Sequence, residues 1–364
     1  MSDKINKTVL VGLSGGVDSS LALILLQEAG YHVIGVSMSI YNQDIPNLLP
    51  AGNACYGAEE KTELKEVADF CRQRAIEYHI FDCSEEYKKI VLSYFREEYL
   101  SGRTPNPCVR CNASMKFGLL PQAAQKQGIP YDFFATGHYA RVEKDEKSGR
   151  FLLKKGLDGK KDQSYFLYRL TQEQLQKTLF PLGNMTKEQT RKMAAERKIP
   201  ASDKEDSQDF YAGHYTDLLQ AEPKKGLIRH INGQILGTHN GFWNFTIGQR
   251  KGLGVSYKEP LFVVDLDAEH NIVVVGAAGD LSKKEAIVTN ACWIAFDKMP
   301  KEPFEAVAKH RSTQAGQKVL VLPLPEEKNG FKVIFEEPQK SLTPGQSLVL
   351  YQEDIVLGGG ILSA

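Results

Sequence analysis

The sequence predicts an α/β fold in which a parallel sheet with helices on both faces is followed by a small central domain and a C-terminal β-barrel. In the first 210 residues, short apolar runs alternate with helical patterns, which is typical of a parallel sheet. From Ala286 onward the hydrophobic period changes to two, and glycine and proline turns separate short runs, as in a small barrel. We therefore expect domains at residues 1–210, 211–280 and 281–364.

The chain has 364 residues, enough for two or three domains with separate cores. Its apolar content of 42% and charged content of 25% are those of a soluble globular protein. No apolar run approaches the roughly 18 residues of a membrane span, and the start from Met1 to Lys7 does not resemble a signal peptide. We expect a cytoplasmic protein with no membrane partner. Because acidic and basic residues number 45 each, a nucleic acid would have to be held by local basic patches.

A glycine turn near the N-terminus joins the first expected strand to the first expected helix. The apolar run from Thr8 to Leu13 suits a buried strand, and the run from Leu21 to Ala29 suits a helix that ends at Gly30. Between them, Ser14 to Ser20 place backbone N–H groups and hydroxyls at a helix N-terminus, which predicts an anion site, with phosphate as the expected anion. No lysine follows the glycines, so the turn is not a Walker loop, and it does not match G-x-G-x-x-G. Asp18 is placed to hold Mg²⁺ or to orient a ligand; the alternative is an ordinary glycine-rich turn.

The same alternation continues through the first domain. We expect strands at Val33–Met38, Glu77–Phe81 and Tyr131–Ala135, and helices at about Glu59–Arg74, Glu85–Leu100, from Asn112, Thr171–Thr178 and Thr186–Arg197. Ligands of parallel sheets lie beyond the carboxyl ends of the strands. Ser14, Met38, Gly137 and His138 all fall at that edge, so they could surround one nucleotide.

Two long loops carry cysteines that the scaffold does not need. The first, Tyr41 to Gly57, contains Cys55, and the second, Gly102 to Asn112, contains Cys108 and Cys111 just before a predicted helix. Long loops in compact domains are usually functional or disordered, and cysteine favours the first. A helix N-terminus lowers the pKa of a thiol, so we expect a raised thiolate fraction at this pair. Six cysteines over this length do not form a disulfide framework, and redox or metal chemistry fits the close pair better.

The rest of the chain carries basic and aromatic residues on expected β-structure. In the central region these are Lys224, Lys225, Arg229, Arg250, Lys251, Phe242, Trp243 and Phe245. Interleaved in this way they suit RNA phosphates and unstacked bases, although a solvated face over a small aromatic core would look the same. We expect barrel strands at Ala286–Phe296, Phe304–His310, Lys318–Leu322, Phe331–Phe335 and Ser347–Leu362. His310 and Arg311 leave one strand together, where they could contact RNA.

Six segments in order give the chain a family resemblance. Ser14–Ser20 resembles the PP-loop of the ATP pyrophosphatases, which split ATP between the α and β phosphates and activate an oxygen as an adenylate. Five further segments stand in the order found in the bacterial tRNA-specific 2-thiouridylases: Gly102–Asn112, Ala135–Tyr139, Lys161–Leu167, Thr246–Gly254 and Thr343–Ser347. The resemblance spans almost the whole chain. It implies 2-thiolation of the wobble uridine in tRNA anticodons, with ATP and Mg²⁺ as cofactors and AMP and pyrophosphate as products.

The resemblance also implies which residues bind ATP and tRNA. For ATP it implies the PP-loop and the adjoining sheet edge: Gly12, Leu13, Ser14, Gly15, Gly16, Val17, Asp18, Ser19, Ser20, Met38 and Gly137. His138 would contact phosphate or act as an acid or base. For the anticodon stem-loop of tRNA it implies polar residues in the later motifs and the barrel: Lys161, Asp162, Gln163, Arg250, Lys251, Arg311, Ser312 and Gln346.

The cysteines depart from the commonest pattern of this family. That pattern has Asp-x-x-Cys and then a second cysteine that receives a persulfide; here Cys111 matches the first cysteine, Cys108 replaces the aspartate, and Tyr211 stands where the second cysteine would be. Cys108 and Cys111, with Cys55 from the neighbouring loop, suit three ligands of an iron–sulfur cluster, as in the cluster-dependent branch of the tRNA thiolation enzymes. We expect a 4Fe-4S cluster whose free iron binds hydrosulfide, with Cys108, Cys111 and Asp18 as catalytic residues.

Two other uses of these cysteines stay open. Cys108 and Cys111 could be a redox pair that works through a persulfide on Cys111, or they could help to hold a structural zinc, although three ligands with no nearby fourth fit a closed zinc site poorly. The sulfur donor would be hydrosulfide or a persulfide-carrying protein. We expect Cys71, Cys83 and Cys292 to be packing residues.

Two other functions compete with tRNA thiolation. Another PP-loop adenylating ligase acting on a small molecule would need an ammonia source or an amine pocket, whereas the Cys108/Cys111 loop and the two extra domains favour sulfur and a macromolecule. A non-catalytic RNA-binding protein switched by ATP would not require the intact loop. Release of pyrophosphate that depends on tRNA would exclude this last alternative.

Overall fold

The computed structural model describes residues 6–41, 54–57, 59–200, 210–211, 213–325 and 329–363. Its contacts divide the chain into two compact units. The first contains residues 1–91, 107–214 and 353–357, and the second contains residues 92–106, 215–352 and 358–364. These units are not the three predicted domains, whose boundaries stay a prediction.

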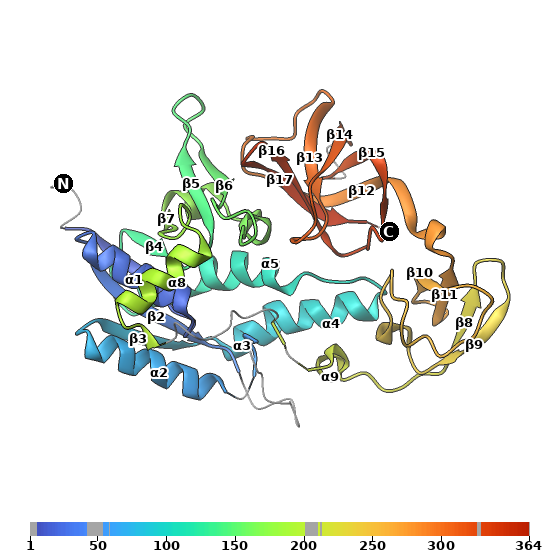
Figure 1. Ribbon diagram of the computed structural model, residues 1–364, viewed down its shortest axis with the longest axis horizontal. Helices are drawn as coiled ribbons and strands as arrows, with labels where there is room; N and C mark the ends of the chain where they lie inside the picture. Colours follow the sequence, from blue (N-terminus) through green and yellow to red (C-terminus); the bar gives the residue numbers. More distant parts are fainter. Residues whose placement is uncertain are drawn as a thin grey trace. The chain divides into compact units, whose positions relative to one another are not determined.

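A parallel sheet forms the centre of the first unit, with its strands in the order β3-β2-β1-β4-β7 (Figure 1). The strands are β1 (Thr8–Gly12), β2 (His32–Ser39), β3 (Glu77–Asp82), β4 (Phe133–Ala135) and β7 (Thr178–Leu179). β1 lies in the middle, since Leu10 pairs with Ile34 on one side and with Phe134 on the other. Val9, Leu10 and Val11 are fully buried, as expected for a parallel strand covered on both faces. The predicted α/β fold is confirmed.

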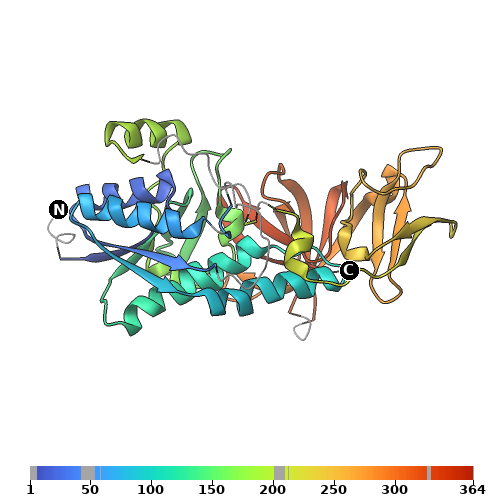
Figure 2. The same ribbon diagram turned by 90° about the horizontal axis from the view of Figure 1, so that it is seen from below.

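Helices cover both faces of this sheet. α1 (Val17–Glu28) and α2 (Glu60–Gln73) share a hydrophobic core with the strands, and α8 (Lys187–Glu196) packs against α1. α6 (Leu120–Lys126) contacts β2 and β3. Figure 2 shows the blue helices α1 and α2 on one side of the sheet and the teal segment that contains α6 on the other. Helices on both faces leave the edge at the carboxyl ends of the strands for ligands.

Other helical segments are short or irregular. They are α3 (Ser84–Tyr87), the π-helical η1 (Lys88–Leu92), α4 (Ser93–Leu100), α5 (Pro107–Cys111), the π-helical η2 (Asn112–Leu119), η3 (Ser164–Leu167), α7 (Gln172–Gln176), α9 (Tyr215–Leu219), η5 (Phe242–Asn244) and η6 (Ala278–Leu281). α5, η2 and α6 follow one another without a break, so their helix begins at Pro107 and not near Asn112. Proline suits the first helical position because its φ is already helical. The prediction that Cys108 and Cys111 precede the helix is therefore wrong: both lie inside its first segment.

A hairpin of β5 (Ala140–Lys144) and β6 (Phe151–Lys155) follows β4 in the first unit and is absent from the sequence-based prediction. The Asp145 carboxylate closes its turn by accepting hydrogen bonds from the backbone N–H and the hydroxyl of Ser148. Further along, Thr171 begins α7 with a capping box, so the predicted helix there is shorter than expected but correctly started.

The second unit contains a four-stranded sheet and the barrel strands, except for residues 355–357 of the last strand, which belong to the first unit. The sheet has the order β10-β11-β8-β9, from β8 (Gly226–His230), β9 (Ile235–His239), β10 (Phe262–Asp267) and β11 (Ile272–Gly276). The barrel strands are β12 (Ser282–Trp293), β13 (Phe304–Lys309), β14 (Gln317–Pro323), β15 (Phe331–Lys340), β16 (Ser347–Gln352) and β17 (Ile355–Leu362). They run in the order β12-β15-β14-β13-β16-β17, and β12 also pairs with β17, which closes the predicted barrel. The single strand predicted from Ser347 to Leu362 is two strands, separated at Glu353, whose φ is 53°.

Within the residues that the structure describes, no helix combines the length and the apolar character that a membrane span requires.

Asn271 ties the four-stranded sheet to the segments beside it. It is buried and has a φ of 54°, in the left-handed region that asparagine tolerates better than most residues. Its side-chain amide donates to the carbonyls of Lys224 at 3.0 Å and Lys225 at 2.9 Å, and its side-chain oxygen accepts from the backbone N–H of Phe242 at 3.2 Å. One side chain therefore satisfies three main-chain groups.

We predict that Asn271→Ala lowers the free energy of unfolding by about 3 kcal/mol, because each hydrogen bond contributes roughly 1 kcal/mol and alanine is strained at positive φ. Asn271→Gly removes the same hydrogen bonds without the strain, so it should destabilise less. Urea unfolding followed by the fluorescence of Trp243, which packs against the core of this sheet, measures the effect. An unchanged urea midpoint in the alanine variant would contradict the assignment.

Candidate active site

The turn between β1 and α1 folds back on itself at the edge of the sheet. Gly15 has a φ of +78°, a conformation that glycine adopts without strain. The backbone N–H of Ser14 donates to the Ser19 hydroxyl at 3.2 Å, and that hydroxyl donates to the carbonyl of Gly16 at 3.2 Å. Gly16 is the N-cap residue and has no side chain with which to cap α1. Backbone amides at the start of α1 are thus presented without a side-chain cap, in the geometry of an anion site.

Two neighbouring contacts fix the strand that feeds this turn. The backbone N–H of Leu13 donates to the carbonyl of Val36 at 2.8 Å, and the buried Ser37 hydroxyl donates to the carbonyl of Leu13 at 2.7 Å. Gly12 pairs with Val36, so Met38 lies two residues further along β2, toward the carboxyl edge. Ser37 is a residue that sequence reasoning missed.

The Asp18 carboxylate, in the first turn of α1, is held by two side chains from distant segments. The Lys187 ammonium lies 2.8 Å from both carboxylate oxygens, and the Tyr139 hydroxyl donates to one of them at 2.9 Å. The side chain of Lys187 is only 10% exposed. Asp18 therefore forms an ion pair with Lys187, and its predicted role of holding Mg²⁺ or orienting a ligand stays a prediction. Neither Lys187 nor Tyr139 was indicated as a partner, because 169 residues separate Lys187 from Asp18.

A second layer of hydrogen bonds holds these two partners. The backbone N–H of Tyr139 donates to the Gln163 side chain at 2.9 Å, and the backbone N–H of Gln163 donates back to the carbonyl of Tyr139 at 3.0 Å. The carboxylate of Asp158 accepts from the backbone N–H of Lys187 at 3.0 Å. Asp162 accepts from the backbone N–H of Gly156 at 3.1 Å, among other bonds of its own loop. Gln163 and Asp162 therefore stabilise the loop beside Asp18, and their predicted contact with tRNA stays a prediction, as does that of Lys161.

The exit of β4 approaches the first turn of α1 closely. A Cβ atom on Gly137 would lie 2.6 Å from the backbone carbon of Asp18 and 2.6 Å from the backbone nitrogen of Ser19. Only glycine fits at such a distance without a shift of the backbone. The structure thus brings Gly137 and the turn together at the predicted edge.

His138 lies next to Gly137 among aromatic rings. Its Nδ1 is 2.7 Å from the Thr136 hydroxyl, and its ring contacts those of Phe117 and Phe180. Burial, together with the smaller effect of the positive charge of Lys116, lowers the pKa of His138 to about 3. This shift favours the neutral imidazole, which donates a hydrogen bond from one ring nitrogen and accepts one at the other. The predicted phosphate contact or acid–base role of His138 stays a prediction.

The three cysteines predicted to act together share two neighbours. Cys55 is exposed, whereas Cys108 and Cys111 are half-buried in α5. The pKa of Tyr87 is raised first by burial and then by Cys111, Cys55 and Cys108. Burial by itself lowers the pKa of Lys116, but the same three thiols raise it, and the net change is upward. The three thiols therefore lie close enough to Tyr87 and Lys116 to influence the charge of both side chains.

The expected low pKa of the cysteine pair is wrong for Cys111. Burial raises the pKa of its thiol to about 11, against the opposing pull of the Lys116 charge. Desolvation therefore raises the pKa of this thiol by more than the N-terminus of the helix lowers it. Burial also raises the pKa of Cys71 to about 11 and that of Cys83 to about 12, as expected of packing residues.

The cysteine side chains near Lys116 are of the right chemical type for an iron–sulfur cluster, because such clusters are bound by thiolates. Over the described ranges, however, no three cysteine, histidine or acidic side chains are gathered as a metal site.

The predicted RNA-binding residues divide into exposed and internal ones. Gln249 holds the turn that precedes β10: its side chain accepts from the backbone N–H of Thr246 at 3.0 Å and donates to the carbonyl of Lys251 at 2.9 Å. Arg250 and Lys251 are exposed on this turn, and Arg311 is exposed after β13. Their contact with tRNA stays a prediction, together with that of Ser312.

Other residues of the predicted RNA surface are buried or engaged. Phe242 and Phe245 are buried in the hydrophobic core of the four-stranded sheet. Their expected role in stacking on RNA bases is therefore wrong, and for these two residues the alternative of a small aromatic core is confirmed. His310 is also buried, and burial lowers its pKa to about 4, so it does not face RNA as expected. The side chain of Gln346 donates to the carbonyls of Thr104 and Pro105, both at 3.1 Å.

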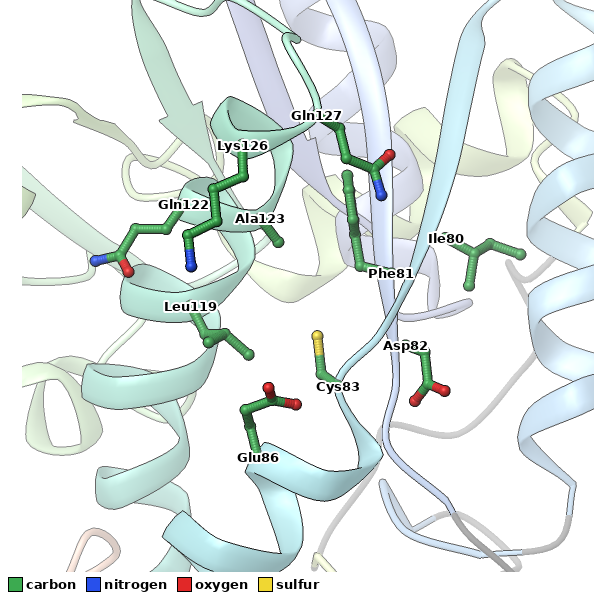
Figure 3. Close-up of a pocket in the computed structure, with 10 residues that line it drawn as sticks. All are labelled: Ile80, Phe81, Asp82, Cys83, Glu86, Leu119, Gln122, Ala123, Lys126 and Gln127. Atoms are coloured by element: carbon green, nitrogen blue, oxygen red, sulfur yellow. The ribbon is translucent and has the colours of Figure 1, made fainter.

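A separate pocket of about 380 Å³ lies in the first unit, where β3 ends beside α3 and α6 (Figure 3). Phe81, Cys83, Glu86, Leu119 and Lys126 are among the residues that line it. None of the predicted ATP, tRNA or cluster residues does.

Comparisons with known proteins cover nearly the whole chain. Residues 7–211 match the family model described as the tRNA methyl transferase HUP domain, residues 217–277 the tRNA methyl transferase PRC-barrel domain, and residues 283–362 the aminomethyltransferase beta-barrel domain. The tRNA-specific 2-thiouridylase MnmA of Endomicrobium trichonymphae is 46% identical over 363 residues, which are 97% of this chain and 98% of that protein. The protein of the same name from Clostridioides difficile (strain 630) is 40% identical over 365 residues, which are 98% of each chain.

A solved structure, the U34-tRNA thiolase NcsA from Methanococcus maripaludis with its [4Fe-4S] cluster, is similar at 16% identity and a TM-score of 0.35, over 59% of this chain and 65% of that one. This likeness is too low to carry an argument about chemistry. The two relatives at 46% and 40% identity are both named tRNA-specific 2-thiouridylase, and this chain aligns with nearly their full length. The chain therefore belongs to the MnmA family of tRNA-specific 2-thiouridylases, a family of tRNA sulfurtransferases.

Proposed function

We propose that this protein replaces the C2 oxygen of the wobble uridine in tRNA anticodons by sulfur, and that Ser14–Ser20 bind the ATP that activates this oxygen. The observation that carries the proposal is the geometry of the turn: amides without a side-chain cap open α1, with Asp18 beside them and Gly137 packed against their backbone. Membership of the family gives the tRNA and the sulfur chemistry. We also propose that the protein acts in the cytoplasm.

The need for ATP follows from the leaving group. A carbonyl oxygen does not leave as hydroxide at neutral pH, whereas an oxygen bound to AMP leaves readily. The uridine O2 would form a bond to the α-phosphorus while the bond from that phosphorus to the β-bridging oxygen breaks, and the electron pair leaves with pyrophosphate. The N3 proton passes to solvent, which leaves a C2–N3 double bond. Hydrosulfide then adds at C2, and the C2–O2 bond breaks with its electron pair on AMP. The proton of hydrosulfide passes through solvent to N3, which gives 2-thiouridine.

The residues around the turn have separate tasks in this proposal. Backbone amides and the hydroxyls of Ser14, Ser19 and Ser20 hold phosphate oxygens, and the Asp18 carboxylate takes Mg²⁺ once ATP is bound. The neutral imidazole of His138 offers a hydrogen bond to phosphate or to the base. The rest of the proposed ATP site is Gly12, Leu13, Gly15, Gly16, Val17, Met38 and Gly137.

Sulfur delivery is assigned to the region of Cys108 and Cys111. The three thiols, with the Lys116 ammonium beside them, suit a 4Fe-4S cluster, which when bound would supply an iron that can hold hydrosulfide. A Cys108/Cys111 pair acting through a persulfide on Cys111 is the alternative, and its sulfur would come from a persulfide-carrying protein. In both cases the positive charge of Lys116 favours anionic sulfur in the site.

The wobble base would have to leave its stack to reach this edge, which an anticodon loop permits at modest cost. Exposed Arg250, Lys251 and Arg311 would hold RNA phosphates. Lys161, Asp162, Gln163, Ser312 and Gln346 remain proposed contacts, although Gln163 and Gln346 already bond within the protein.

Gly137→Ala should lower tRNA-dependent release of pyrophosphate by about 10²-fold, because the new methyl group pushes the backbone of Asp18 and Ser19 away, and misplacement by about 1 Å can cost this much. Gly279→Ala is the matched control, since it lies outside the site and a Cβ there meets nothing within 4 Å. Enzymatic assay of pyrophosphate measures both. Equal rates in the two variants would remove Gly137 from the site.

Cys108→Ser and Cys111→Ser should each abolish formation of 2-thiouridine while ATP binding survives, because sulfur delivery and adenylation use different residues. Cys292→Ser, in the barrel, serves as the control. Mass spectrometry of digested tRNA measures thiolation, and iron and sulfide analysis of anaerobically purified protein should give about four of each per chain. Iron-free protein that thiolates tRNA normally would exclude the cluster and leave the persulfide alternative.

Arg250→Ala combined with Lys251→Ala should weaken tRNA binding, because two positive charges that neutralise RNA phosphates are removed. The slope of log affinity against log salt should fall by about 1 for each phosphate that the variant no longer neutralises. The control is Lys298→Ala with Lys301→Ala, which removes the same charge from another exposed segment. Filter binding at several salt concentrations gives the slopes. If the affinity and slope stay at the control values, this patch does not bind tRNA.

A further inference from the structure

The turn from Ser14 to Ser20 contains no lysine or arginine, although it is proposed to hold a triphosphate. In glycine-rich phosphate loops of the Walker type, a lysine within the motif supplies the positive charge. Here the structure brings a lysine from elsewhere in the chain: Lys187 lies 169 residues after Asp18, and its ammonium is 2.8 Å from both oxygens of that carboxylate. Because Asp18 is the second residue of α1, this ammonium lies within about one side-chain length of the first-turn amides.

The position of Lys187 is fixed by its own element. It is the first residue of α8, whose start is capped by Thr186 and Gln189, and its backbone N–H donates to the Asp158 carboxylate. Its side chain is almost entirely buried, and the ammonium lies 5.8 Å from the centre of the Tyr139 ring. A long side chain with a fixed backbone can move its charged end over a short arc without any change in the fold.

The charges of the site change when ligands arrive. In the structure, the single negative charge of Asp18 and the single positive charge of Lys187 compensate each other. A Mg²⁺ ion on the Asp18 carboxylate would displace the ammonium, which would then need another anion in this sheltered position. The phosphate chain of ATP is the anion that the proposed reaction brings.

We propose that Lys187 is the phosphate-binding lysine that the turn itself lacks: it neutralises Asp18 while the site is empty and binds the phosphate chain once Mg²⁺ occupies Asp18. As the bond from the α-phosphorus to the β-bridging oxygen breaks, the electron pair moves onto that oxygen, and the ammonium stabilises the negative charge that builds there. This inference rests on the proposed use of ATP.

Lys187→Met tests the inference, because methionine is similarly long and carries no charge. The Kd of magnesium pyrophosphate, measured by calorimetry without tRNA, should rise at least about tenfold. The kcat of tRNA-dependent pyrophosphate release should fall about 10²-fold, as when one preorganised donor is removed, with a smaller change in the KM for ATP. Lys192→Met removes an exposed lysine from the same helix and should leave all three values unchanged.

A second pair of variants separates phosphate binding from a purely structural ion pair. In Asp18→Asn there is no carboxylate for Lys187 to hold, so a lysine that acts only through Asp18 would have no further effect. Adding Lys187→Met to Asp18→Asn should still raise the Kd of pyrophosphate at least about tenfold. This double variant also leaves no unpaired buried charge, so it keeps the test available if Lys187→Met alone does not fold. An unchanged Kd in the double variant, relative to Asp18→Asn, would overturn the inference.

The wild-type protein distinguishes this inference from the proposed function. If it forms no AMP and pyrophosphate with tRNA, the proposed use of ATP fails and the inference fails with it. If it forms both products and Lys187→Met matches its rate and its Kd, the inference alone fails.

Discussion

The Asp18 carboxylate is the point at which separate segments of the first unit meet. It sits in the first turn of α1, where helix geometry directs backbone amides toward an anion, and a nearly buried ammonium and a phenol hold it there. A carboxylate in such a place is costly unless it is paired and hydrogen-bonded. Lys187 and Tyr139 supply that compensation, so the start of α8 and the exit of β4 are constrained by the same group.

This constraint extends to a loop whose sequence resembles a tRNA-contact motif. Gln163 holds both main-chain groups of Tyr139, and Asp158 holds the backbone of Lys187. The conformation of residues 156–164 therefore determines how firmly Asp18 is held.

At Cys111, two opposing effects determine the pKa of the thiol. Burial raises the pKa of Cys111, and the nearby ammonium of Lys116 opposes this without overcoming it. In the protein alone, the thiol is therefore protonated near pH 7. Conversion to a thiolate would need a further positive charge, which a bound metal cluster or a closer approach of Lys116 would provide.

The parallel sheet, the closed barrel and the turn before α1 could be predicted, because each rests on local hydrophobic period and glycine placement. The ion pair of Asp18 with Lys187 could not, since nothing local marks two charges that are 169 residues apart as partners. Phe242, Phe245 and His310 were misjudged for a related reason: composition does not reveal which face of a strand or turn is buried. The helix start at Pro107 could have been predicted, because proline is common at the first helical position. The cysteine spacing drew attention away from this signal.

The central claim is that ATP makes the uridine oxygen a leaving group, and the fate of that oxygen tests it most directly. An anticodon stem-loop with ¹⁸O at C2 of the wobble uridine is incubated with the protein, ATP, Mg²⁺ and sulfide, and the AMP is analysed by mass spectrometry. The account predicts one ¹⁸O atom in AMP for each 2-thiouridine formed. Thiolated RNA accompanied by unlabelled AMP would contradict it.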